Sequence, residues 1–293
     1  MMMVKTYQIA GIVFQVNLSD SDVYQDDGIL SEYRVESDFF DHSLRFKIVE
    51  NLSLPVGECV FSDPSKRVFS DGNLTIRYDG SVGLSLDAAY LRIARNGNYS
   101  QVEVKKSSIP HGITPKLVMQ AMEMEHQIVI KDGILFHSSY IRIGDEAVLF
   151  TAPSGTGKST QADLWVKYRG AELLNGDRSV VRMEEKGVFV HGIPFAGSSS
   201  VRRNVKLPLK AIVYLAQAPQ TRIVRLKGAK AFRCIWEGCS VNVWHEGDIE
   251  QCSKTVSELA TRIPVYYLPC TPDESAVIAL ENELGELYAE KKN

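Results

Sequence analysis

A lysine and two hydroxyl residues follow a glycine-rich turn near the middle of the chain. The segment reads Ala152-Pro-Ser-Gly-Thr-Gly-Lys-Ser-Thr160, which follows the phosphate-loop pattern G-x-x-x-x-G-K-[ST] except that Ala152 replaces the first glycine. Alanine fits there if its φ is negative. Gly155 and Gly157 let the main-chain amides curl around anionic oxygens, and a helix beginning near Lys158 adds the positive end of its dipole. These residue types predict a site for a nucleotide's phosphates.

The phosphate-binding residues and their cofactors follow from this pattern. Lys158 supplies a charge to the β- and γ-phosphates and Ser159 a hydroxyl to Mg²⁺, so we expect ATP and Mg²⁺ as cofactors. As part of a loop, Lys158 is expected to be exposed and to contribute little to stability. The alternative is an ordinary Gly-Ser turn before a helix; the apolar run AVLFT before it and the helical STQADLWVKY after it favour a nucleotide site. The assigned residues are Pro153, Ser154, Gly155, Thr156, Gly157, Lys158, Ser159 and Thr160.

Two further polar residues end apolar segments. Asp177 follows Leu-Leu-Asn-Gly about 20 residues after the loop, where a carboxylate binds Mg²⁺ or accepts a proton from an attacking hydroxyl. His137 ends Ile-Leu-Phe-His, where an imidazole can contact the oxygens of a transferring phosphoryl group. The alternatives are a solvated aspartate in a turn and a hydrogen-bonded core histidine.

A second glycine- and serine-rich loop spans residues 192–200 and is followed by Arg202 and Arg203. One interpretation is that it closes over the phosphates and that an arginine neutralises charge in the transition state. The other is a flexible, solvated loop. His191, just before it, is interpreted as structural.

Hydrophobic patterning separates two regions. Residues 1–110 contain period-two and β-branched segments, residues 33–40 among them, divided by turns such as DDG and NGN, which predict a β-rich domain. Residues 111–293 alternate strands and helices, which predicts an α/β domain, with the boundary near 105–115. Residues 134–151 are expected to form two strands around the turn at Gly144-Asp145.

Five helices are expected. The first has a Thr114 cap, Pro115 at its first position and one apolar face to Val129, and the second runs from Lys158 to about Tyr168 and is closed by Gly170. Two more lie near 228–238 and 249–262, and the last has a Thr271 cap with Glu274 completing a capping box.

Composition narrows the function classes. A net charge of −3 and a pI near 6.1 give no reason to expect nucleic acid as a partner. No apolar run approaches the roughly 18–20 residues of a membrane span. The five cysteines form no C-x-x-C pair, and we interpret them as buried thiols of a cytoplasmic protein rather than a metal site built on Cys234 and Cys239.

Several of these motifs together resemble a known family. The segments, in chain order, are Gly133-Ile-Leu-Phe-His137, the loop at 152–160, Asn175-Gly-Asp-Arg178, His191-Gly-Ile-Pro-Phe-Ala-Gly197 and Pro208-Leu-Lys-Ala-Ile-Val-Tyr-Leu215. This combination resembles the C-terminal domain of HPr serine kinase/phosphorylase, within the phosphoenolpyruvate-carboxykinase-like group of P-loop proteins. The resemblance covers about residues 110–275. The first 110 residues do not resemble the N-terminal domain of that enzyme, which suggests a separate branch.

The resemblance implies an α/β P-loop fold and an active centre made of His137, Lys158, Ser159 with Thr160, and Asp177. Its counterpart loop favours involvement of residues 192–203, with Arg203 preferred as a catalytic residue. The family has an Asp-Asp pair where this chain has Asp177-Arg178. Asp177 then both binds metal and acts as base, or Glu184 or Glu185 folds back, or catalysis is lost and nucleotide binding remains.

We therefore expect an ATP-dependent kinase that transfers the γ-phosphoryl group to a hydroxyl of a protein serine, a peptide or a small molecule. The alternative is a catalytically reduced nucleotide sensor. The metal and arginine sites of true carboxykinases are missing from the sequence, as are the signatures of motor ATPases. Relatives form oligomers, so a homo-oligomer is compatible with the resemblance, although no sequence signal indicates one.

Overall fold

The computed structural model of the chain describes residues 2–19, 23–83, 85–197 and 200–290. Its contacts divide the chain into two compact units, Met1–Gln127 and Ile128–Asn293, and the division falls inside helix α2 (Met124–Val129). The limits expected from the sequence, 1–110 and 111–293, stay a prediction. A β-rich N-terminal sheet followed by a mixed α/β region is confirmed.

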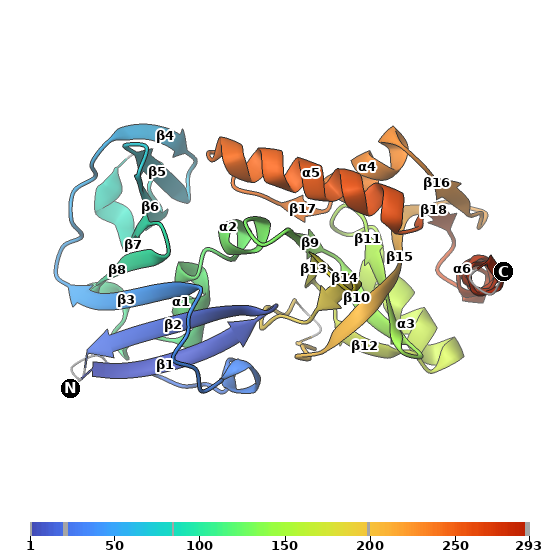
Figure 1. The fold of residues 1–293 in the computed structure, drawn as a ribbon, viewed down its shortest axis with the longest axis horizontal. Coiled ribbons are helices and arrows are strands. Elements are labelled where there is room, and N and C mark those ends of the chain that lie inside the picture. Colours follow the sequence, from blue (N-terminus) through green and yellow to red (C-terminus); the bar gives the residue numbers. More distant parts are fainter. Residues whose placement is uncertain (1, 20–22, 84, 198–199, 291–293) are drawn as a thin grey trace. The chain divides into compact units, whose positions relative to one another are not determined.

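The first unit is built on one eight-stranded sheet (Figure 1). The strand order is β1-β2-β3-β8-β7-β6-β5-β4, with β2, β3 and β8 parallel and the other neighbours antiparallel. A turn with positive φ at Ala10 (51°) and Gly11 (77°) joins the first two strands, as a tight hairpin requires. The strands are β1 Met2–Ile9, β2 Ile12–Ser19, β3 His42–Val49, β4 Glu58–Ser62, β5 Lys66–Ser70, β6 Leu74–Gly80, β7 Ala89–Asn96 and β8 Tyr99–Lys105.

Short helical segments complete this unit. The 3₁₀ turns are η1 Ser31–Tyr33, η2 Leu86–Ala88 and η3 Lys106–Ser108, and the first α-helix is α1 Pro115–Ala121. The predicted cap is confirmed, because the Thr114 side chain accepts a hydrogen bond from the Leu117 amide at 3.3 Å. The predicted single helix to Val129 is wrong. Glu123 has a φ of 48°, which ends α1 and separates it from α2.

The second unit contains a ten-stranded sheet. Its order is β12-β10-β11-β15-β14-β13-β9-β17, with β18 beside β15 and β16 beside β18. Strands β11, β15 and β18 run parallel. The strands are β9 Gly133–His137, β10 Ser139–Ile143, β11 Glu146–Thr151, β12 Glu172–Asn175, β13 Arg178–Glu184, β14 Gly187–His191, β15 Lys206–Gln217, β16 Val224–Leu226, β17 Cys239–Ser240 and β18 Val265–Cys270.

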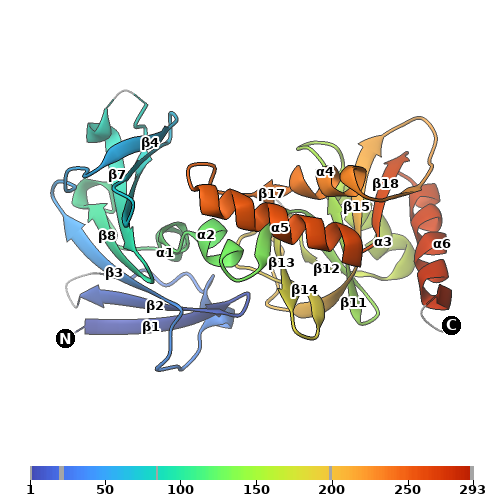
Figure 2. The same cartoon turned by 45° about the horizontal axis from the view of Figure 1, so that its top comes forward.

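Helices cover both faces of this second sheet (Figure 2). They are α3 Lys158–Arg169, α4 Ala229–Trp236, α5 Glu246–Arg262 and α6 Glu274–Glu290. Alternate residues of the central strands face opposite layers: Leu149 and Ile212 pack toward α4 and α5, whereas Phe150 and Val213 pack toward α3 and α6. The period of two along β11 and β15 thus makes a three-layer arrangement.

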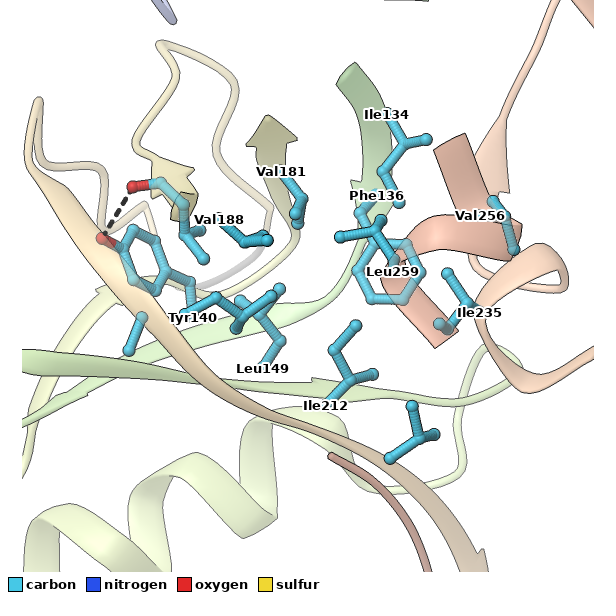
Figure 3. Packing of buried hydrophobic residues seen from close by; sticks show 14 of the residues in the cluster. Ile134, Phe136, Tyr140, Leu149, Val181, Val188, Ile212, Ile235, Val256 and Leu259 are labelled. Carbon is cyan, nitrogen blue, oxygen red and sulfur yellow. Dashed lines mark hydrogen bonds between the residues drawn. The ribbon is translucent and has the colours of Figure 1, made fainter. Parts of the chain in front are cut away.

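The core on the α4/α5 side is shown in Figure 3. Phe136 on β9 packs with Ile235 of α4 and Leu259 of α5. At the other end of the cluster, the buried Tyr140 hydroxyl donates to main-chain oxygens, with Val190 O at 3.4 Å. This packing fixes β9, and therefore the strand end that carries His137.

Three further expectations are corrected by the structure. The run from Ile134 to Ile143 is two strands, since β9 ends at His137 and β10 pairs with β11 and β12 instead. Helix α6 begins at Glu274 with the Asp273 carboxylate accepting from the Ser275 amide at 2.9 Å, so the cap is not Thr271. Residues 33–40 form no strand apart from one bridge between Tyr7 and Arg34.

The cysteines differ from the expectation of buried thiols. All five are free; Cys252 is buried, Cys59 is exposed, and Cys234, Cys239 and Cys270 are half-buried. Across the described residues, no helix has both the length and the apolar character needed to cross a membrane.

Candidate functional site

The glycine-rich loop joins the end of β11 to the start of α3. Gly155 (φ 77°) and Gly157 (φ 115°) adopt the conformations that favour glycine. Ala152 is buried without a positive φ, so the alanine that replaces the usual first glycine is unstrained. Residues 153–155 are exposed and Ser159 and Thr160 face solvent. The mouth of α3, capped by Gly157 without a side-chain hydrogen bond, is therefore accessible to an anion.

Lys158 folds back over the loop. Its ammonium donates to Ala152 O at 3.1 Å and to Pro153 O at 3.5 Å. The residue is only 8 % exposed, so the expectation of an exposed lysine was wrong. Lys158 is the first residue of α3 and is among the buried residues of that helix. Burial lowers its pKa, and the negative charge of Asp177 opposes that shift.

His137 and Asp177 lie together at one edge of the sheet. The His137 Nε2 is 3.5 Å from Asp177 Oδ1. Antiparallel pairing of β9 with β13 places His137 opposite Arg178, and the Ser138 amide donates to Asp177 O at 3.0 Å. The Thr151 hydroxyl at the end of β11 donates to His137 O at 3.0 Å. These bonds join the histidine both to the start of the phosphate loop and to the turn that carries Asp177.

Burial and the neighbouring charges together lower the pKa of the His137 imidazole below its ordinary value of 6.5. Burial lowers its pKa, and the cations Lys158 and Arg178 lower it further, while Asp177 opposes them. A neutral imidazole can accept as well as donate a hydrogen bond. Lys158 and Asp177 both act on the pKa of His137, in keeping with the hydrogen bonds that join these segments.

Arg178 occupies the second side of the Asp177 carboxylate. Its Nε is 3.5 Å from Asp177 Oδ2, and both side chains are about a third exposed. One oxygen of Asp177 therefore faces an imidazole and the other a guanidinium. Such partly solvated pairs are held weakly, so Arg178 can turn away without a large cost.

Asn175 attaches the second loop beside Asp177. Its buried side chain donates to Ile193 O at 3.4 Å and to Phe195 O at 2.6 Å, and accepts from the Asp177 amide at 2.9 Å. A Cβ added to Gly197 would lie 2.7 Å from the Asp177 Cβ. The loop therefore lies against the Asp177 side chain.

The arginines after this loop are placed differently from each other. Arg202 forms a main-chain bridge with Asn175. Arg203 is exposed, and its carbonyl oxygen would lie 1.7 Å from a Cβ added to Gly192. The structure brings Arg203 into no described contact with Asp177. Ser198 and Ser199 of the predicted loop lie outside the described residues.

The acidic residues considered as substitutes are remote. Glu184 ends β13, seven residues from Asp177, which corresponds to about 20 Å along a strand. Its carboxylate accepts from His191 Nε2 at 2.8 Å and also pairs with Lys206. Glu185 lies in the following turn. Neither reaches the loop, and His191 has the structural position expected for it.

Three residues of this region were not predicted as candidate site residues. Asn175 and Gly197 support Asp177, and Gln161 lines a cavity of about 730 Å³ beside the phosphate loop. Asn175 and Gly197 do lie within the recognised segments Asn-Gly-Asp-Arg and His-Gly-Ile-Pro-Phe-Ala-Gly, so their motif was visible although their roles were not.

Comparison with known proteins gives a family for this site. Residues 113–273, which include the loop, His137 and Asp177, match the family described as SynChlorMet cassette protein ScmC. The chain belongs to the ScmC family. Its name states neither a reaction nor a ligand.

A solved structure also matches the ScmC chain at a distance. It is that of the HPr(Ser) kinase/phosphatase from Coxiella burnetii, with 13 % identity and a TM-score of 0.32, covering 54 % of this chain and 94 % of that one. At this level the match establishes no shared activity. No curated protein matches the sequence.

Proposed function

We propose that this ScmC protein is a Mg·ATP-dependent phosphotransferase of the HPr-kinase-related type, acting on a hydroxyl acceptor in the cytoplasm. The loop of residues 153–160 holds the triphosphate through its main-chain amides, except at Pro153, which has no amide hydrogen. The Lys158 ammonium moves from the loop carbonyls to the β- and γ-phosphates. The observation that carries this proposal is the grouping of Lys158, His137 and Asp177, with His137 Nε2 at 3.5 Å from Asp177 Oδ1.

The proposed reaction uses Asp177 as the base. The acceptor oxygen bonds to the γ-phosphorus, the bond from that phosphorus to the β–γ bridging oxygen breaks, and ADP leaves. The acceptor's proton passes to the Asp177 carboxylate. When the substrate binds, His137 turns its Nε2–H from Asp177 to a γ-phosphoryl oxygen, and Lys158 balances the charge on the phosphates. The acceptor is a protein serine, a peptide or a small alcohol.

The donor set beside the loop fits magnesium. Mg²⁺ takes oxygen ligands and keeps several waters, and Ser159 offers an exposed hydroxyl while Asp177 offers a carboxylate a third exposed. Bound there, the ion would neutralise charge on the β- and γ-phosphates. Arg178 would have to release Asp177 Oδ2 for this.

Two variants test the proposal. Lys158→Met removes the charge but keeps the buried stem, and we expect ATP affinity to fall about a hundredfold or more. Asp177→Asn should leave ATP affinity within about threefold while abolishing transfer, because the amide accepts no proton. Calorimetry measures binding, and γ-labelled ATP offered with protein, peptide and alcohol acceptors measures transfer. Unchanged ATP affinity in Lys158→Met would contradict the site; undiminished transfer by Asp177→Asn would move the base elsewhere.

The contact between Arg178 and Asp177 favours a second candidate, a nucleotide sensor without turnover. Arg178→Asp recreates the acidic pair that the resembling family has. If the wild type binds ATP without transfer to any acceptor and Arg178→Asp gains transfer or hydrolysis, the wild-type protein is a nucleotide sensor. Wild-type transfer that persists in the variant supports the kinase.

A further inference from the structure

An uncharged cavity opens beside the phosphate loop in the second unit. It measures about 730 Å³, within the range of small-ligand sites. The loop, α3 and the ends of β15 and β18 form its walls, and the described residues lining it include no charged side chain: Gly155, Thr156, Gly157, Thr160, Gln161, Leu215, Ala216, Gln217, Ala218, Cys270 and Pro272.

Gln161 is the buried polar residue of this wall. It is 2 % exposed, and its main-chain amide donates to Gly157 O at 2.9 Å in the first turn of α3. Its Oε1 lies 4.0 Å from the Cys270 Sγ. Within the described part of the chain, its Nε2 is buried without a hydrogen-bond partner. A buried amide without a partner is uncommon and costly, which points to a ligand atom that the amide would meet.

We infer that this cavity takes the nucleoside part of the bound nucleotide and that the Gln161 carboxamide is a specificity-determining contact to its base or ribose. The inference rests on the proposed function. Phosphates held at residues 155–160 leave the nucleoside next to the loop, and the cavity shares four of those residues. Away from the loop, its uncharged lining suits a neutral base and sugar.

The carboxamide can be reoriented at low cost. Rotation about its last side-chain bond breaks no hydrogen bond of Nε2 and only the long contact to Cys270. Gln217, an exposed residue whose Nε2 lies at the limiting distance of 3.5 Å from Thr156 O, offers a second carboxamide in the same cavity. Carboxamides both donate and accept, which suits the edge of a base.

The test compares ATP with inorganic tripolyphosphate, which carries the phosphates without a nucleoside. Affinities are measured by calorimetry for the wild type, Gln161→Met, the shorter amide Gln161→Asn, and Asp163→Asn as a control on an exposed position of α3. We expect Gln161→Met to bind ATP about three- to tenfold more weakly, the effect of one neutral hydrogen bond, with tripolyphosphate unchanged. Gln161→Asn should shift in the same direction and Asp163→Asn not at all.

Each outcome decides a separate point. Equal losses for both ligands would show that Gln161 only supports the loop, and no loss for either would show that the nucleoside lies elsewhere; both overturn the inference and leave the phosphate site intact. Wild-type protein that binds neither ligand overturns the proposed function itself. If Gln161→Met fails to melt cooperatively, the ratio of the ATP and tripolyphosphate affinities of Gln161→Asn decides.

Discussion

At the scale of single residues, Asp177 is held by backbone geometry rather than by its own charge partners. Asn175 accepts from its amide, and Gly197 lies against its Cβ. The side-chain pairs with His137 and Arg178 are both 3.5 Å long. Position is therefore set by the main chain, which leaves the carboxylate free to exchange partners when a substrate binds.

The contact of Gly197 with Asp177 yields a prediction. In Gly197→Ala the new Cβ lies 2.7 Å from the Asp177 Cβ, so the carboxylate must shift. A displacement of this size lowers turnover by about ten- to a hundredfold, with ATP affinity within about twofold, since the phosphate loop is untouched. Steady-state transfer and calorimetry measure the two effects.

The matched control for Gly197→Ala is Gly285→Ala on α6, where an added Cβ meets nothing within 4 Å. It should keep full turnover and gain slightly in stability, as glycine to alanine does within helices. Equal turnover in the two variants would show that Asp177 does not need its present position.

The residues of the candidate site were predictable as neighbours because each ends or follows an apolar run. His137 and Asp177 are brought together by β9 and β13, and the loop follows β11. The supporting residues were not predictable in their roles, since the contacts of Gly197, Asn175 and Gln161 arise from segments far apart in the sequence. Arg203 was favoured slightly over Arg202, and the main-chain bridge to Asn175 belongs to Arg202.

At the scale of elements, local sequence signals correctly predicted where α3 begins and ends. Helix α3 begins at Lys158 and ends at Arg169, and Gly170 with φ 64° closes it as expected. The break between α1 and α2 was missed because it depends on tertiary charge pairing. Glu123, with its positive φ, faces Arg95 Nε at 3.2 Å and Arg77 Nη1 at 3.6 Å, and nothing in the local sequence indicates those partners.

This buried cluster makes Glu123 a test of element stability. Glu123→Gln removes the carboxylate and leaves two arginines that are each under a tenth exposed. Breaking a buried pair from one side costs about 3 kcal/mol or more, so the free energy of unfolding from urea denaturation should fall by that amount.

Glu50→Gln is the control, because Glu50 makes the same kind of pair with Lys106 at 2.9 Å while both side chains are mostly exposed. Its removal should change stability little. A Glu123→Gln protein as stable as Glu50→Gln would mean that Asp79, 3.0 Å from Arg77, is enough to balance the charge of the buried arginines.

At the scale of the whole molecule, each unit has its own core. Ile76, Tyr78 and Val82 belong to a cluster of the first unit, whereas the clusters around Phe136 and Phe150 belong to the second. The three tryptophans of the chain, Trp165, Trp236 and Trp244, all lie in the second unit. Tryptophan fluorescence therefore reports on the second unit alone.

His42 of β3 gives the first unit a specific acid sensitivity. Its buried Nε2 bonds the Ser100 hydroxyl at 2.9 Å, and its Nδ1 accepts from the Gln127 amide at 3.2 Å. Burial, with Arg95 and His126 nearby, lowers its pKa from 6.5 to about 4. The unfolded chain therefore takes up a proton at a higher pH than the folded one. This contribution to stability is present above pH 6.5 and is lost as the pH falls through 6.5 toward 4.

We expect His42 to cost the first unit about 2 kcal/mol of stability between pH 7.5 and pH 5. His42→Gln, which keeps a hydrogen-bonding side chain but does not titrate, should remove that part of the pH dependence. Urea denaturation of the first unit is monitored by hydrogen exchange of peptides from β3 and β8. Tryptophan fluorescence, which monitors the second unit, should give the same urea midpoint for the wild type and His42→Gln. The free energies of unfolding of His42→Gln and the wild type should differ in their slope against pH. A difference that is constant with pH would reflect lost packing instead. Parallel slopes would contradict the prediction, because they would mean that the folded and unfolded chains protonate His42 at the same pH, with the Gln127 side-chain oxygen turned to accept from the imidazolium.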